Sequence, residues 1–291
     1  MPENCPLLHW FLPAGGDRAD ISRPVQLARA AEQAGFTSLF APVGPGRADP
    51  WQLASVLAGQ TERLAFLVGV RAGAASPTLL AQQADAFRRF TGGRLRLHVT
   101  ARDGDRAVHD QRYGRTDEVM AALRDLLDGR RIAFQGQHVQ VEGARLADPA
   151  VEHKVPLYFG GTPGAGENVA ARRADVHVVS GSAGHGAVAA RIARLRDRNP
   201  ALRFALCMNV ADAPGRTAQL VREYRRLGVD EFVLSGRPEP DEVLRVGAEV
   251  RGLENAAAPP PRGTGRDGAA LASDGVTPAI RRSGRCRRGC R

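Results

Sequence analysis

Three residues that follow a short apolar run have types suited to binding a phosphate group. The run 157–159 has the length and composition of a buried strand. It is followed directly by Gly160, Gly161 and Thr162, and then by an alanine-rich segment with helical character. Glycines let the backbone approach a ligand closely, and the first amides of a helix are free to donate to an anion. The stretch therefore predicts an anion site, although many α/β proteins make the same turn and bind nothing there.

A second pair of residues, His109 and Tyr113, stands in a polar stretch and is separated by four positions. If this stretch is helical, both side chains lie on one face of the helix. An imidazole and a phenol hydroxyl can both donate hydrogen bonds to an anion. Taken alone, however, such a pair is more often a loop histidine and a half-buried tyrosine.

The elements that must position these residues alternate between strand and helix. Apolar runs are each followed by a segment with helical spacing, eight times in about 250 residues. The expected strands cover residues 7–12, 36–40, 64–70, 95–100, 157–159, 176–179, 204–210 and 232–234. We predict a (β/α)8 TIM barrel with an external hairpin at 131–146, in which function lies in the loops after the strands. A doubly wound open sheet is the alternative.

Composition predicts two parts of unequal character. The chain has 291 residues, of which 43% are hydrophobic, and a net charge of +10. Residues 255–291 contain eight arginines and two aspartates, so this segment carries +6 and residues 1–254 carry the remaining +4. We predict a barrel over 1–254 and a disordered basic tail over 255–291, because the tail has few large apolar residues. Nucleic-acid binding is not expected, since the tail has no aromatic side chain for base stacking.

Other classes of function have little support in the sequence. The four cysteines are scattered, so we expect neither a disulfide framework nor a metal site. No apolar run approaches the ~18 residues of a membrane span. The first residues lack the pattern of a signal peptide, and we therefore expect a cytoplasmic protein without membrane contact.

Several segments share their order and spacing with one enzyme family. They cover residues 11–13, 66–71, 76–78, 83–94, 109–113, 156–161 and 227–236. This set resembles the bacterial luciferase-like flavin monooxygenases, and within them the FMNH2-dependent alkanesulfonate monooxygenases. The resemblance extends over nearly all of 7–254.

The resemblance implies a barrel that binds reduced FMN, which a separate NAD(P)H-dependent flavin reductase supplies. Such an enzyme uses O2 to oxidise a small organic substrate, and members of the alkanesulfonate branch release sulfite and an aldehyde. We also expect a homo-oligomer. The cofactor-binding residues implied in this chain are His98, Thr100, His109, Tyr113, Gly160, Gly161 and Thr162.

The chain departs from the family pattern where chemistry is expected. Arg47 stands at a cysteine position, Asn209 at a histidine position, Arg237 at a tyrosine position and His98 at an asparagine position. Residues 211–216 are short where the family has a long insertion with a mobile lid. The predicted fold is thus a luciferase-like barrel with a shortened loop after the seventh strand.

These departures change the predicted catalytic residues, which are Asn209, Arg47 and Arg237. Asparagine can hydrogen-bond to a bound group but cannot act as an acid or base near pH 7. Two guanidinium groups at the barrel mouth suit an anionic substrate such as a sulfonate, carboxylate or phosphate. The other interpretation is that Arg47 and Arg237 are ordinary surface arginines.

Two alternative functions remain open. The first is an oxidoreductase of the same superfamily that uses the deazaflavin F420, whose longer acidic tail could contact Arg102, Arg106 and Arg112. The second is a non-catalytic flavin-binding remnant, which the substituted positions and the missing lid favour.

Overall fold

The computed structural model describes residues 6–13, 20–101, 109–147, 154–161, 163–212 and 214–257. Two of the predicted cofactor-binding residues are not fully described. Thr162 lies outside the described residues, and of His109 only the backbone is described. The predicted tail lies outside them from residue 258 onward, while the last helix ends at Ala257.

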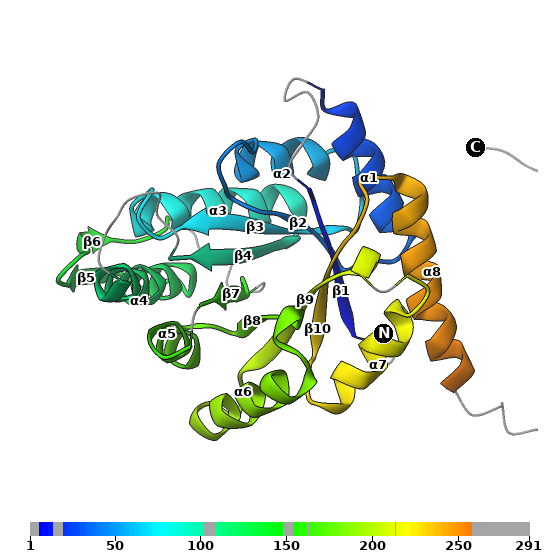
Figure 1. Cartoon of the computed structure of the whole chain (residues 1–291). Coiled ribbons are helices and arrows are strands. Elements are labelled where there is room, and N and C mark those ends of the chain that lie inside the picture. The colour runs from blue at the N-terminus through cyan, green and yellow to red at the C-terminus, as the bar shows by residue number, and fades with distance from the viewer. Residues whose placement is uncertain are drawn as a thin grey trace, which may run out of the picture. The chain divides into compact units, whose positions relative to one another are not determined.

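The described residues form a closed barrel of eight parallel strands (Figure 1). The strands are β1 (Leu7–Phe11), β2 (Ser38–Ala41), β3 (Ala65–Arg71), β4 (Leu95–Thr100), β7 (Leu157–Gly160), β8 (Val176–Ser180), β9 (Arg203–Asn209) and β10 (Glu231–Ser235). Because β1 pairs in parallel with both β2 and β10, the sheet has no free edge. The (β/α)8 barrel is confirmed, and the open doubly wound sheet is wrong.

Helices follow the strands and cover the outside of the barrel, as Figure 1 shows. They are α1 (Ser22–Gln33), α2 (Pro50–Ala58), α3 (Pro77–Thr91), α4 (His109–Leu127), α5 (Ala165–Arg173), α6 (His185–Arg198), α7 (Thr217–Arg226) and α8 (Pro240–Ala257). The predicted external hairpin is confirmed as the antiparallel pair β5 (Ile132–Gln135) and β6 (Gln140–Ala144). Only residues 210–216 join β9 to α7, and they include a short 3-10 turn, Val210–Asp212.

Local sequence signals fix the starts of two helices that border the barrel mouth. The Asp49 carboxylate accepts a hydrogen bond from the Gln52 amide at 3.0 Å and is followed by Pro50. Ser76 caps α3 in the same way, through the Leu79 amide at 3.2 Å. A short polar side chain at the N-cap and a proline at the next position both favour a helix start. These caps hold the ends of the loops that follow β2 and β3.

The polar stretch that contains His109 and Tyr113 is helical, and α4 begins at His109. The polar residues of this turn gave no apolar periodicity, and the helix is stabilised instead by Tyr113, which is buried against Phe159. His109 and Tyr113 are therefore one helical turn apart along α4.

The strand register determines which side chains point into the barrel. His9, Ser38, Arg96, Tyr158 and Glu231 belong to the inward-facing set, whose members pair with one another across neighbouring strands. These positions lie near the amino-terminal ends of their strands. The neighbouring residue Trp10 faces outward and contacts Phe36, so alternation places His9 inside.

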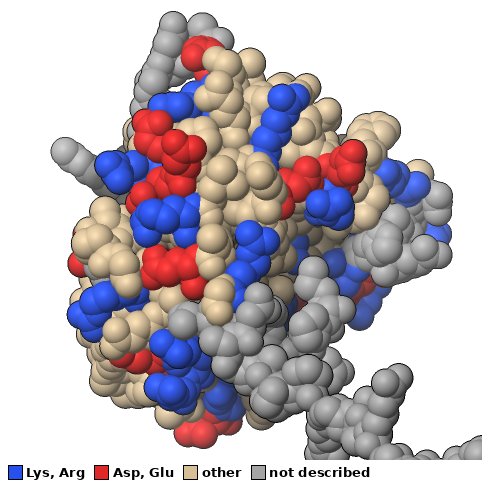
Figure 2. All heavy atoms as spheres, turned by 90° about the vertical axis from the view of Figure 1, so that its right-hand side faces the viewer, with Lys and Arg blue, Asp and Glu red and all other residues tan. Residues whose placement is uncertain are grey.

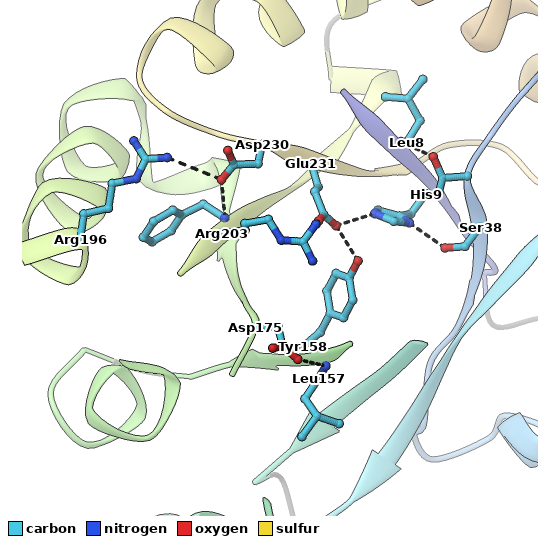
Figure 3. A network of polar contacts seen from close by, with 12 residues as sticks. Leu8, His9, Ser38, Leu157, Tyr158, Asp175, Arg196, Arg203, Asp230 and Glu231 are labelled. Atoms are coloured by element: carbon cyan, nitrogen blue, oxygen red, sulfur yellow. Dashed lines mark hydrogen bonds and ion pairs between the residues drawn. The ribbon is translucent and has the colours of Figure 1, made fainter. Parts of the chain in front are cut away.

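A buried carboxylate joins these residues into one network (Figure 3). One oxygen of Glu231 accepts hydrogen bonds from the Tyr158 hydroxyl at 2.6 Å and from His9 Nε2 at 2.9 Å. The other oxygen accepts from Arg203 at 2.6 Å. His9 Nδ1 lies 2.6 Å from the Ser38 hydroxyl. The network thus connects β1, β2, β7, β9 and β10.

Charge and hydrogen bonding keep this carboxylate ionised. Burial alone would raise the pKa of Glu231, but the contacts with His9, Arg203 and Tyr158 outweigh it and the pKa lies below its usual value. The same burial lowers the pKa of His9 and raises that of Tyr158. A buried charge is tolerated because both carboxylate oxygens accept hydrogen bonds.

One face of the molecule carries side chains of both charges. Figure 2 shows basic and acidic side chains interspersed over the face that lies to the right in Figure 1. Among the described residues, no helix is both long and apolar enough to cross a membrane.

We expect Tyr158→Phe to lower the free energy of unfolding by about 1–3 kcal/mol, because Glu231 then loses a buried donor. Urea unfolding at pH 7 measures this change. Tyr224→Phe is the control, since Tyr224 is also buried but its hydroxyl lies 3.4 Å from the Gly181 carbonyl. An equal loss in both variants would contradict a special role for the network.

Candidate functional site

A cavity of about 650 Å³ opens at the carboxyl-terminal ends of the strands. Its lining residues come from the ends of β1 to β4 and from the loop after β2, and they are Phe11, Phe40, Pro42, Val43, Gly44, Pro45, Arg47, Arg71, His98 and Thr100. Three predicted site residues, Arg47, His98 and Thr100, are thus brought together. The volume lies within the usual range for small-molecule sites, about 300–1,000 Å³.

Gly69 brings the loop after β2 across the barrel mouth. A methyl group added at Gly69 would lie 2.6 Å from the Val43 amide nitrogen and 3.1 Å from the Ala41 carbonyl oxygen. The backbone of this loop therefore packs directly on β3. Without that close approach, Val43 and Arg47 would lie further from the strand ends.

His98 forms part of the inner wall of the cavity. Its ring meets the edge of Phe40 at 5.0 Å between centroids. A methyl group added at Gly160 would lie 3.7 Å from His98 Nε2, so the glycine leaves space beside the imidazole. Removal from bulk water lowers the pKa of His98 to about 4. The imidazole is therefore neutral at pH 7 and can both donate and accept hydrogen bonds.

Arg47 is held in place by uncharged groups. Its Nη1 donates to the Leu12 carbonyl oxygen at 2.9 Å, and its guanidinium lies over the Phe11 ring, 5.2 Å from the centroid. Burial lowers the pKa of this guanidinium, but an arginine remains charged at pH 7. The cavity therefore has a fixed, half-buried positive charge on one wall.

The predicted phosphate turn has the expected shape where it is described. Gly161 and Gly166 are in contact, because a methyl group added at Gly161 would lie 2.8 Å from Gly166 Cα. Tyr113 packs beside them, 3.2 Å from a methyl group added at Gly166. The N-cap of α5 is Gly164, at φ +84°, and no side chain caps the helix. The first amides of α5 are thus available to an anion.

Asn209 and Arg237, which were predicted to be catalytic together with Arg47, each contact another residue. The Asn209 side-chain oxygen accepts from the Ala211 amide at 3.1 Å, at the end of β9. Arg237 has a side chain that is 77% exposed and lies 3.5 Å from Glu242. Neither residue lines the cavity described above. Their predicted catalytic roles stay predictions.

Sequence reasoning did not single out Arg71, Phe11 and Phe40 as site residues. All three are at inward-facing positions near strand ends, where Phe11 pairs with Phe40 and Arg71 pairs with Thr100. Alternation along each strand, counted from an inward-facing residue such as His9, Ser38 or His98, would have found them. Within the described ranges, no group of three or more His, Cys, Asp or Glu side chains is placed to hold a metal ion.

We expect Gly69→Ala to lower the free energy of unfolding by about 1–3 kcal/mol, because the methyl group overlaps the loop backbone. Urea unfolding measures the loss. Gly186→Ala is the control, since a methyl group there meets nothing within 4 Å. The prediction fails if the two variants are equally stable.

Acid should destabilise the fold through two imidazoles that are shielded from bulk water, His98 and His177. Burial lowers the pKa of both His98 and His177 from 6.5 to about 4. As the pH falls, the unfolded chain therefore protonates these two histidines before the folded chain does. The stability that the neutral histidines contribute is complete above pH 6.5 and is lost as the pH falls toward 4. Between pH 7 and pH 5 each histidine should lower the free energy of unfolding by up to about 2 kcal/mol.

Unfolding free energies measured across this pH range test the attribution. His98→Gln should reduce the slope of stability against pH. An unchanged slope in this variant would show that His98 does not contribute to the acid destabilisation.

Comparison with known proteins shows the family and the fold. The model of the luciferase-like monooxygenase family matches residues 7–279. EDTA monooxygenase (EmoA) from Chelativorans sp. BNC1 is similar with a TM-score of 0.75 at 13% identity, over 87% of this chain and 94% of that chain. A riboflavin lyase (RcaE), solved with modified FMN and riboflavin, gives 0.75 at 12% identity, over 88% and 93%.

An F420-dependent secondary alcohol dehydrogenase, in complex with an F420-acetone adduct, has a TM-score of 0.69 at 15% identity, over 84% of this chain and 98% of that chain. These similarities show a shared fold. Of these three proteins, the dehydrogenase depends on F420 and the riboflavin lyase was solved with modified FMN. Since the family model covers most of the sequence, the chain belongs to the luciferase-like monooxygenase family.

Proposed function

We propose that the protein is a two-component monooxygenase that uses reduced FMN and O2 on a small, anionic organic substrate of the alkanesulfonate type. The observation that carries the proposal is the cavity at the barrel mouth, which combines aromatic walls with a neutral imidazole and a half-buried arginine. A separate flavin reductase, a homo-oligomeric state and a cytoplasmic location belong to the same proposal.

The residues present fit a flavin mononucleotide. The uncapped start of α5 and the Gly161–Gly166 contact provide open backbone amides for the phosphate, with Tyr113 packed beside them. Gly160 precedes this turn and lies beside His98, because a methyl group added there would be 3.7 Å from His98 Nε2. The ring system would then contact the wall formed by Phe40 and His98. When bound, the reduced flavin supplies the electrons for oxygen activation.

The chain itself contributes positioning and exclusion of water. Phe11, Phe40 and Pro42 form an apolar wall that limits access of solvent to the reacting groups. His98, whose pKa is about 4, holds a hydrogen bond at pH 7 but does not act as a cationic acid. Arg47 provides the positive charge that a sulfonate or carboxylate requires.

The F420-dependent oxidoreductase remains the second candidate. The similar F420-dependent alcohol dehydrogenase supports it, and so does Arg112, whose buried Nε has no hydrogen-bond partner in the described part of the chain. Arg102 and Arg106 lie outside the described residues. A flavin-binding protein without catalysis is the third candidate.

Anaerobic titration of the full chain with reduced FMN distinguishes the candidates. We expect saturable binding, and then, on admission of O2, an absorbance transient that free flavin does not give. Binding without a transient would favour the non-catalytic protein. Binding of F420 but not of FMN would overturn the proposal in favour of the second candidate.

A matched pair of variants tests the phosphate turn in the same titration. Gly161→Ala should weaken binding of reduced FMN at least about tenfold, because the turn must shift to avoid Gly166 and the hydrogen bonds to a charged phosphate are lost. Gly252→Ala, where a methyl group meets nothing within 4 Å, should not.

A further inference from the structure

Two arginines separate the main cavity from a second cavity beside it. The second cavity, of about 420 Å³, lies between β3 and the starts of α2 and α3. Both cavities are lined by Arg47 and Arg71, together with Val43 and Gly44. Arg71 is the last residue of β3 and pairs in register with Thr100. The two guanidinium groups therefore stand at one boundary, although they come from different elements.

The charges of these two arginines are not neutralised by the described residues. Arg47 contacts a carbonyl oxygen and an aromatic ring. Neither arginine forms an ion pair with a carboxylate in the described ranges, and no described Asp or Glu lines the main cavity. Both side chains are half-buried. Partly desolvated cations without a counter-charge favour binding of an anion.

The opposite end of the barrel shows how this protein neutralises an inward-facing arginine. Arg203 donates to the buried Glu231 at 2.6 Å. At the mouth, two arginines face the cavity without such a carboxylate. Arg237, by contrast, is ion-paired with Glu242 and mostly exposed. The difference in partners selects Arg71, and not Arg237, as the second cation beside Arg47.

We propose that Arg47 and Arg71 together form the subsite for the acid group of a small aliphatic substrate. The carbon skeleton would lie against Phe11, Phe40 and Pro42, and the oxyanion would lie between the two guanidinium groups. Each guanidinium presents planar paired donors that match a carboxylate or a sulfonate. The reaction that follows binding rests on the proposed function, whereas binding of the acid group depends only on Arg47 and Arg71.

An oxyanion at this position could also be the phosphate of the cofactor. The uncapped start of α5 offers the phosphate a different place, at the other side of Gly160. The two sources make opposite predictions about riboflavin, which lacks the phosphate. If Arg71 holds the cofactor, its removal weakens binding of reduced FMN but not of reduced riboflavin.

The test is calorimetric titration of the full chain, with and without FMN, using butanesulfonate, butanoate and the neutral 1-butanol. We expect Arg71→Gln and Arg47→Gln each to weaken binding of both acids about 10-fold to 100-fold, the usual effect of losing hydrogen bonds to a charged group. Binding of 1-butanol should stay unchanged. Arg71→Lys should retain part of the affinity, because it keeps the charge but loses the paired donors.

Arg63→Gln is the matched control, because the Arg63 side chain is 79% exposed and lies 4.0 Å from the carboxylate of Glu62. Equal affinity of the acids for wild type and Arg71→Gln would overturn the proposal, as would failure of either acid to bind. A selective loss of FMN affinity relative to riboflavin would also overturn it. Acid binding that depends on Arg71 in a protein that binds no flavin would support the subsite and refute the proposed function.

Discussion

Glu231 is a fully buried carboxylate, and the closed end of the barrel is arranged around it. It accepts from Tyr158 on β7, His9 on β1 and Arg203 on β9, and His9 extends the network to Ser38 on β2. A buried charge of this kind is stable only when several donors converge on it. The network therefore fixes the relative positions of strands on both sides of the β1–β10 contact, where the barrel closes.

The two ends of the barrel interior handle charge in opposite ways. At the amino-terminal end the carboxylate of Glu231 forms an ion pair with the inward-facing Arg203. At the mouth Arg47 and Arg71 line a cavity with no described carboxylate. The first arrangement is suited to stability and the second to binding. This contrast follows from the placement of one glutamate, Glu231, at the amino-terminal end of the barrel interior.

Glycines determine the shape of the mouth. Gly69 allows the loop after β2 to lie on β3, which carries Arg47 to the cavity. Gly160 leaves space beside His98, and Gly161 packs on Gly166 at the start of α5. Gly69 and Gly161 lack room for a Cβ, whereas a Cβ at Gly160 would lie in contact with His98. The cavity and the predicted phosphate turn are therefore consequences of three missing side chains.

The sequence by itself determined the eightfold alternation, the external hairpin and the candidates His98, Thr100, Arg47 and Gly161. These depend on local periodicity, on turn residues and on a pattern of spaced motifs, all of which are readable along one chain. Only the tertiary structure decided that Arg71 stands beside Arg47, that Arg237 is paired with Glu242, and that His9 meets Glu231 across 222 positions. Such contacts depend on barrel closure and strand register, which bring distant residues together and leave no mark in the local sequence.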